Sequence, residues 1–187
     1  MLEQKKVITI INPNLVIQKG DNLGSGIPYL PLTLAYLAAC LKNDYEINLI
    51  DAFGEDPFKI YTIGMFHVQG LTTKEVEERI NPSAECIILY YSTIMANIII
   101  NAAIKNIKAK YPDIPIIIIE NSQAVIGCSL EAIKESLFKA GADYLVFGEN
   151  EERVPLLIKA IEQSSFEKIK NIGGCRASVP AHLQYNQ

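Results

Sequence analysis

The run CIILYYSTIMANIIINAAIKNIKAKYPDIPIIIIE, from Cys86 to Glu120, carries the most informative pattern in the chain. It starts with an apolar stretch over Cys86–Tyr91, continues as a long helical stretch over Ile94–Tyr111, and ends with a second apolar stretch over Ile116–Ile119. Both stretches are hydrophobic along their whole length, as is typical of strands that are buried on both faces of a parallel sheet. The run therefore predicts a strand–helix–strand unit of parallel sheet.

The same alternation continues on both sides of this run. Further strands are expected over Lys6–Ile11, Glu46–Ile50 and Tyr144–Phe147, and Ile169–Ile172 is a candidate sixth strand at the sheet edge. Helices are expected over Leu30–Lys42, from Thr72 or Thr73 through Arg79, over Leu130–Lys139 and over Glu151–Gln163. Residues 12–28 read as a polar, glycine-rich loop, and residues 53–70 show no clean period.

This element order predicts an α/β fold, a doubly wound, Rossmann-like (flavodoxin-like) three-layer arrangement. Right-handed crossovers favour a parallel sheet of five strands in the order 2-1-3-4-5. One domain is expected over residues 1–174, with residues 175–187 as a C-terminal tail. The length of 187 residues suits one domain with a sizeable core.

The charge balance argues against a nucleic-acid surface. The net charge is −4, and no block of Lys or Arg stands out. Lys105, Lys108 and Lys110 are close together, but their helical spacing is typical of a solvated face. No apolar run is long enough for a signal peptide or a membrane span. We therefore expect a cytoplasmic protein with neither nucleic acid nor membrane as a partner.

Several common cofactor sites lack their signatures. The sequence contains no CxxC, no CxxxCxxC, no GxGxxG and no GxxxxGK[ST]. A zinc or iron–sulfur site within this chain, and a standard NAD or ATP site, are therefore not expected. Cys40 and Cys86 lie in apolar patterns that indicate core residues, whereas Cys175 lies in a looser segment. The third strand ends in Tyr91-Ser92, so the aspartate of a phosphoacceptor domain is missing.

Polar and small residues follow each expected strand. Because ligands of open parallel sheets bind beyond the carboxyl ends of the strands, these residues predict a binding site at that edge. They include Asn12, Pro13, Gly26, Asp51, Ser92, Thr93, Glu120, Asn121, Gly148 and Glu149. The alternative is purely structural, because turns and helix caps need the same residue types. Asp51 then ends its strand, Ser92 and Thr93 cap the next helix, and Glu149 complements a helix dipole.

Several segments resemble the cobalamin-binding domain of B12-dependent radical SAM proteins. GIPYLPLTLAYLAACL (residues 26–41) resembles the entry to that family's first helix, and YEINLIDA (residues 45–52) is similar to its second strand. Ser92-Thr93 matches a small hydroxyl pair after the third strand. DYLVFGENE (residues 143–151) resembles an Asp-x-x-x-x-Gly-Glu-Gly-Glu segment, and residues 172–174 resemble the Ile-x-Gly before the catalytic domain.

The resemblance implies a module that holds cobalamin at the carboxyl edge of the sheet. The residues that it places against the cofactor are Asn12, Pro13, Gly26, Pro28, Asp51, Ser92, Thr93, Glu120, Asn121, Gly148 and Glu149. The DxHxxG motif is missing, so cobalamin is expected base-off, without a histidine ligand from this chain. His67 is expected in a loop or helix-packing role, and His182 is expected in the tail, exposed to solvent. The implied partner is a radical SAM catalytic domain or subunit that performs methyl transfer or related chemistry.

Two other functions stay open. The family often has Gly-Gly where this chain has Glu120-Asn121, Asn150 replaces a further glycine, and the CxxxCxxC barrel is absent. These departures favour a degenerate relative that no longer binds cobalamin and acts as a protein-interaction module. A self-contained enzyme is the least favoured, because no nucleophile–base pair or metal set is evident. The sequence leaves the substrate, the reaction and the oligomeric state open.

Overall fold

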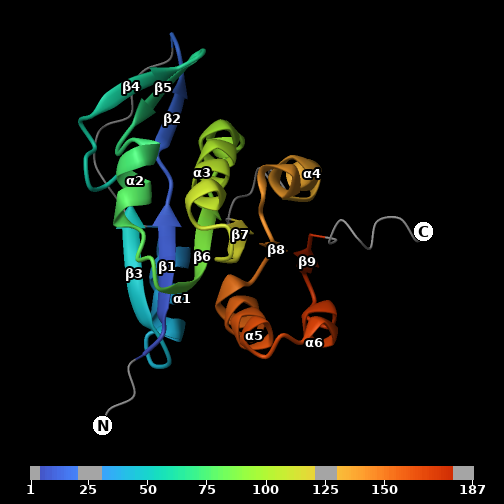
Figure 1. Ribbon diagram of the computed structural model, residues 1–187. Helices are drawn as coiled ribbons and strands as arrows, with labels where there is room; N and C mark the ends of the chain where they lie inside the picture. The colour runs from blue at the N-terminus through green and yellow to red at the C-terminus, as the bar shows by residue number, and fades with distance from the viewer. Residues whose placement is uncertain (1–4, 21–30, 121–129, 179–187) are drawn as a thin grey trace.

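A six-stranded sheet forms the centre of the computed structural model, which describes residues 5–20, 31–120 and 130–178 (Figure 1). Its strands are β1 (Val7–Asn12), β3 (Glu46–Asp51), β6 (Ala84–Tyr91), β7 (Ile116–Glu120), β8 (Tyr144–Val146) and β9 (Cys175–Ala177). Their order is β3-β1-β6-β7-β8-β9; the first five are parallel, and β9 is antiparallel to β8. Counted within this sheet alone, the order is the predicted 2-1-3-4-5 with a sixth strand at the edge.

Helices cover both faces of this sheet, which confirms the predicted three-layer fold. One face carries α2 (Thr73–Arg79), α3 (Asn97–Lys110) and α4 (Leu130–Ala140); the other carries α1 (Leu32–Leu41), α5 (Asn150–Glu162) and α6 (Phe166–Lys170). A 3-10 turn, η1 (Ile94–Ala96), precedes α3. Alternate residues of one strand enter opposite cores: Ile118 packs with α3 and α4, and Ile119 with α1 and α5. Among the described helices, none has the length and apolar character needed to cross a membrane.

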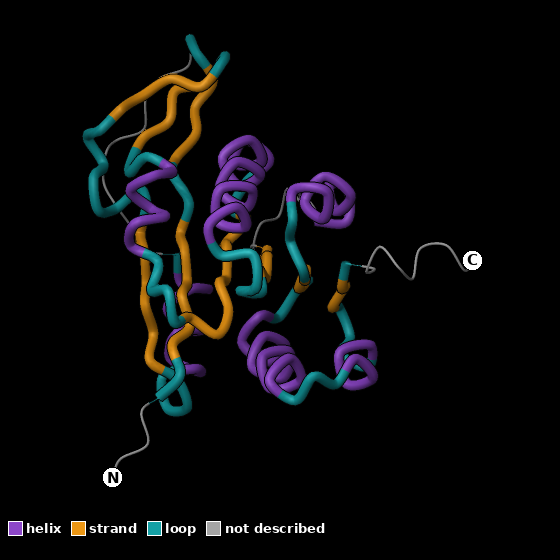
Figure 2. Tube along the Cα trace, viewed as in Figure 1, coloured by secondary structure: helices purple, strands orange, loops and turns teal. Residues whose placement is uncertain are grey.

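A second, small sheet was not predicted. It consists of β2 (Leu15–Gln18), β5 (Phe66–Gln69) and β4 (Ile60–Ile63), paired antiparallel in the order β2-β5-β4. Figures 1 and 2 show it beyond the carboxyl end of β1, from which β2 continues the chain. Its core is Val16, Val68 and Ile99. The small sheet thus occupies part of the loop expected over residues 12–28 and part of residues 53–70, for which the sequence pattern predicted no secondary structure.

The C-terminal end of the sheet corrects two expectations. Ile169–Ile172 does not form the sixth strand, because Ile169 lies in α6 and packs into the core. The sixth strand is β9, which lies in the range expected as tail. It follows the turn at Gly173-Gly174, where Gly174 has a φ of 71°. This reversal explains why β9 runs antiparallel to its neighbour.

The cysteines also differ in part from expectation. Cys86 is buried in β6 as predicted, but Cys40 is exposed, because the buried face of α1 is formed by Thr33, Leu34, Leu37 and Leu41. Cys175, expected in a loose segment, is buried in β9, and burial raises the pKa of its thiol to about 11.

The start of α2 is fixed by a capping box, which makes Thr72 the N-cap of the two candidates Thr72 and Thr73. The Thr72 hydroxyl accepts a hydrogen bond from the Glu75 backbone N–H, and the Glu75 carboxylate accepts one from the Thr72 backbone N–H at 2.8 Å. Lys59 Nζ lies 2.6 Å from Glu75 Oε2. Hydrogen bonding to Lys59 first, and to Thr72 second, lowers the pKa of Glu75 from 4.5 to about 2.

We therefore expect Glu75 to contribute to acid stability. Its pKa is lower in the folded chain, so its contribution is complete above pH 4.5 and is lost as the pH falls towards about 2. Glu75→Gln should flatten the dependence of unfolding free energy on pH in this window, measured by urea unfolding. The control Glu78→Gln removes a carboxylate of α2 that lies 3.9 Å from Lys74 and should leave the dependence unchanged. Equal slopes in all three proteins would contradict the assignment.

Candidate functional site

The carboxyl ends of the central strands bring most of the predicted site residues to one edge of the sheet. Asn12 is paired in register with Asp51, and Tyr91 with Glu120. Gly148 follows β8 on the same edge and donates its backbone N–H to Glu120. Gly26, Pro28 and Asn121 lie outside the described residues. We call this region the carboxyl edge.

At the β1 and β3 end of the carboxyl edge, the side chains are used to shape turns. Asn12 Nδ2 donates to Asp51 Oδ1 at 2.8 Å, and the same oxygen accepts the Gly54 backbone N–H at 2.9 Å. A Cβ at Gly54 would collide with the Asp51 carboxylate. Pro13 is buried. Asp51 therefore closes the turn after β3, which is the structural alternative that the sequence left open.

Asn14, which sequence reasoning did not single out, joins the central sheet to the small sheet. It is buried, and its Nδ2 donates to the Leu71 carbonyl at 2.6 Å and lies 3.4 Å from the Gln69 carbonyl. The signal in the sequence is an asparagine between apolar residues just after a strand.

Ser92 and Thr93 follow β6 at the middle of the sheet. They do not cap α3: its N-cap is Ala96, without a side-chain hydrogen bond, and Thr93 contributes only its carbonyl, which accepts from Ala96 N at 3.0 Å. Ser92 is half-buried and Thr93 is exposed. Within the described part of the chain, neither hydroxyl has a hydrogen-bond partner. Both hydroxyls lie beside β1 and β6, where the strand order reverses.

The side chain of Glu120, at the end of β7, points inward and bonds to backbone groups of the protein. Its Oε1 accepts the Gly148 backbone N–H at 3.0 Å, and its Oε2 accepts the Leu130 backbone N–H at 3.2 Å. Leu130 begins α4, so the carboxylate lies where the orphan N–H groups of a helix favour negative charge. The chain's own carboxylate thus occupies two donors that an anionic ligand would otherwise use.

The turn before α5 is shaped by glycine and a buried asparagine. Gly148 has a φ of 74°, and a Cβ there would collide with the Arg153 guanidinium, which donates to the Phe147 carbonyl. Glu149 is exposed at the N-cap position without a side-chain capping bond. Asn150 is fully buried, and its Nδ2 donates to the Glu120 carbonyl at 2.9 Å. Its Oδ1 has no hydrogen-bond partner among the residues that the structure describes.

The carboxyl edge carries hydroxyl, amide and carboxylate side chains, with no histidine among its described residues. Among the described residues, no group of three or more His, Cys, Asp or Glu is placed to hold a metal. His67 lies on β5 in the small sheet, where its Nδ1 is 3.3 Å from the Thr62 hydroxyl. His182 is outside the described residues.

No protein-family model and no curated protein matches the chain.

Proposed function

We propose that this protein is a cobalamin-binding module that works with a radical SAM catalytic domain or subunit, and that cobalamin binds at the carboxyl edge near β1 and β6. The observation that carries the proposal is the pair of hydroxyls, Ser92 and Thr93, which have no partner among the described residues and lie at the point where the strand order reverses. Ligands of doubly wound sheets bind at that point. The ordered sequence motifs that resemble B12-binding domains supply the identity of the ligand.

The residues fit base-off cobalamin through polar contacts rather than through cobalt. The corrin ring carries amide side chains, and its nucleotide tail carries a phosphate, so both offer partners for hydroxyl groups. Ser92 and Thr93 each supply one donor and two acceptor lone pairs. Beyond β8, the exposed Glu149 completes the proposed contact region, whereas the Gly148 N–H is already bonded to Glu120. When bound, the cofactor would supply the cobalt centre for methyl transfer or related radical chemistry in the partner.

Hydroxocobalamin binding tests this proposal. We expect the corrin absorbance to co-elute with the protein at a one-to-one ratio after desalting. The double variant Ser92→Ala/Thr93→Ala should bind about tenfold more weakly, because each lost hydrogen bond contributes about 0.5–1.5 kcal/mol.

Ser83→Ala is the matched control. Ser83 precedes β6 at the opposite edge of the sheet, where its hydroxyl donates to Asn81. It should bind like the unmodified protein, and circular dichroism should show that all variants are folded. A protein that emerges colourless from desalting would exclude the proposal.

The second candidate function is a protein-interaction module that has lost cobalamin binding. It is favoured by Glu120, whose carboxylate takes up the N–H groups of Gly148 and Leu130. Stoichiometric corrin binding in the experiment above would remove this candidate.

A further inference from the structure

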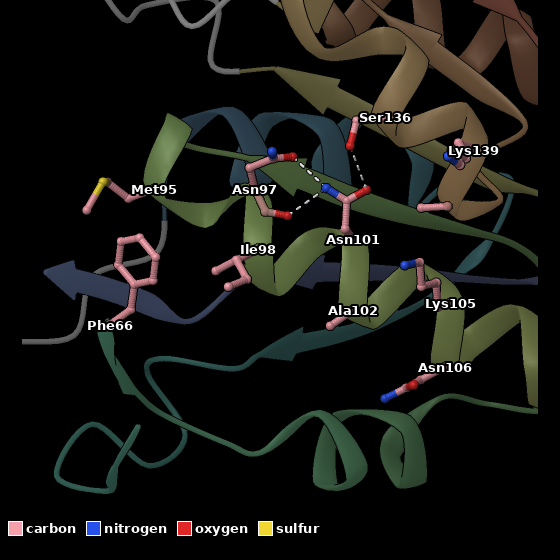
Figure 3. Close-up of a pocket in the computed structure, with 11 residues that line it drawn as sticks. Phe66, Met95, Asn97, Ile98, Asn101, Ala102, Lys105, Asn106, Ser136 and Lys139 are labelled. Atoms are coloured by element: carbon pink, nitrogen blue, oxygen red, sulfur yellow. Dashed lines mark hydrogen bonds between the residues drawn. The ribbon is translucent and has the colours of Figure 1, made fainter. Parts of the chain in front are cut away.

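A groove of about 1030 Å³ lies between α3 and α4 (Figure 3), and none of the described residues that line it belongs to the carboxyl edge. Its two ends differ in chemistry. Phe66, Met95 and Ile98 form an apolar end, and Lys105, Asn106 and Lys139 form a cationic, polar end. Ile98 and Lys105 are seven residues apart on α3, so the two ends are separated by two helical turns, about 10 Å.

The two lysines of the groove differ from the other lysines of the same helices. On α3, Lys108 Nζ lies 2.8 Å from Asp143, and Lys110 Nζ lies 3.1 Å from Glu77. On α4, Lys134 is paired with Glu131. Lys105 and Lys139 have no carboxylate within ion-pair distance in the described residues, and no Asp or Glu lines the groove.

The sequence pattern suggested a single solvated face for Lys105, Lys108 and Lys110. The ion pairs divide this set, because only Lys105 faces the groove. In a chain with a net charge of −4, two unpaired cations from different helices at one end of a groove leave a local site for an anion.

A polar ladder connects the two helices in the middle of the groove. Ser136 Oγ on α4 lies 3.3 Å from Asn101 Oδ1, and Asn101 Nδ2 donates to Asn97 Oδ1 at 2.7 Å (Figure 3). The Ser136–Asn101 bond joins α3 to α4, whereas the Asn101–Asn97 bond lies within α3. The middle of the groove is therefore lined by polar groups that already bond to one another.

The geometry points to a binding site for a small amphipathic anion in this groove. The anionic head, a carboxylate or a phosphate monoester, lies between Lys105 and Lys139, and the apolar tail covers Phe66, Met95 and Ile98. The groove matches the size of common ligand pockets, which combine apolar walls with a few polar groups. The inference is independent of cobalamin binding, because it uses none of the carboxyl edge residues.

Titration of the full-length chain with octanoate, followed by NMR of its backbone amides, tests the inference. We expect shift changes centred on Ile98, Asn101, Lys105 and Lys139. Octyl phosphate in a parallel titration identifies the preferred head group, and the tighter of the two anions defines the ligand class. Neutral 1-octanol should bind at least fivefold more weakly. Raising the ionic strength should weaken octanoate binding, because the lysines are exposed.

Variants separate the two ends of the groove. Lys105→Gln and Lys139→Gln should each weaken octanoate about threefold, and the double variant about tenfold, as expected for exposed ion pairs. Ile98→Ser should weaken octanoate and leave the response to inorganic phosphate unchanged. Lys168→Gln, in α6 and outside the groove, is the matched control. Equal binding of octanol and octanoate, shifts centred elsewhere, or unchanged affinity in the lysine variants would overturn the inference.

Discussion

Gly70→Ala should lower the free energy of unfolding by about 3 kcal/mol or more, because backbone strain and a backbone collision add together. Gly70 has a φ of 120°, which side chains with a Cβ rarely adopt. A Cβ there would lie well inside van der Waals contact with the Ala52 carbonyl oxygen, and 2.8 Å from Asn14 Nδ2. The same carbonyl accepts the Leu71 backbone N–H at 2.7 Å. The collision thus falls on the junction between the central and the small sheet.

Gly64→Ala is the matched control for this prediction. Gly64 also has a positive φ, 57°, but a Cβ there meets nothing within 4 Å. Its replacement should cost only the left-handed conformation, about 1 kcal/mol. Urea unfolding of both variants measures the difference. Equal losses in the two variants would show that the contact with Ala52 is relieved without cost.

Glu120→Ala should destabilise the protein by about 3 kcal/mol, because it removes two hydrogen bonds to a charged acceptor. The Gly148 and Leu130 backbone N–H groups lose their partner, and the ends of β7, β8 and the start of α4 are no longer connected through one carboxylate. Glu120→Gln should be intermediate, since its amide offers one oxygen and turns an NH2 group towards the second N–H. Urea unfolding and hydrogen exchange at Gly148 and Leu130 measure these effects.

Glu135→Ala provides the control, because Glu135 is an exposed acid on α4. It should change the unfolding free energy by less than about 0.5 kcal/mol, as is usual at surface positions. If Glu120→Ala were equally mild, the carboxylate would not hold this edge together.

The middle of the central sheet was predictable because β1, β6 and β7 are mostly buried. Residues 86–91 of β6 and 116–119 of β7 are continuous apolar runs, and no surface helix needs such a pattern. The start of α2 was predictable to within one residue, because Thr72 and Thr73 can both cap a helix. The capping box with Glu75 selects Thr72 in the structure. Apolar runs and helix caps can be predicted because they depend only on residues that are close together in the sequence.

The small sheet and the sixth strand were not predictable in the same way. β2 and β4 have four residues each and are mostly exposed or half-exposed. Both pair with β5, and β2 is far from β5 in the sequence, so no local pattern indicates that pairing. β9 has three residues after a glycine turn. Strands this short carry little periodicity, so the expected edge strand was placed over α6 instead.

The candidate site was predictable in position but not in detail. The carboxyl ends of the strands had to meet at one edge, whichever side chains they carried. The direction of the Glu120 carboxylate was not predictable. A glutamate that follows a strand gives the same sequence pattern whether its side chain points to solvent or to a helix N-terminus. Whether Ser92 and Thr93 cap a helix likewise depends on where α3 begins. The N-cap of α3 is Ala96, about one turn after Thr93, so neither hydroxyl is in the capping position.

The small sheet also bears on the order of events during folding. Pairing β2 with β5 closes a loop of about 50 residues that contains α1 and β3, and closing long loops is slow and entropically unfavourable. β1 pairs with β3 and β6 through larger buried surfaces, which bring both ends of that loop together. We therefore expect β2 to pair with β5 only after the central strands have assembled. The backbone amides of β2 should then be the last to gain protection from hydrogen exchange.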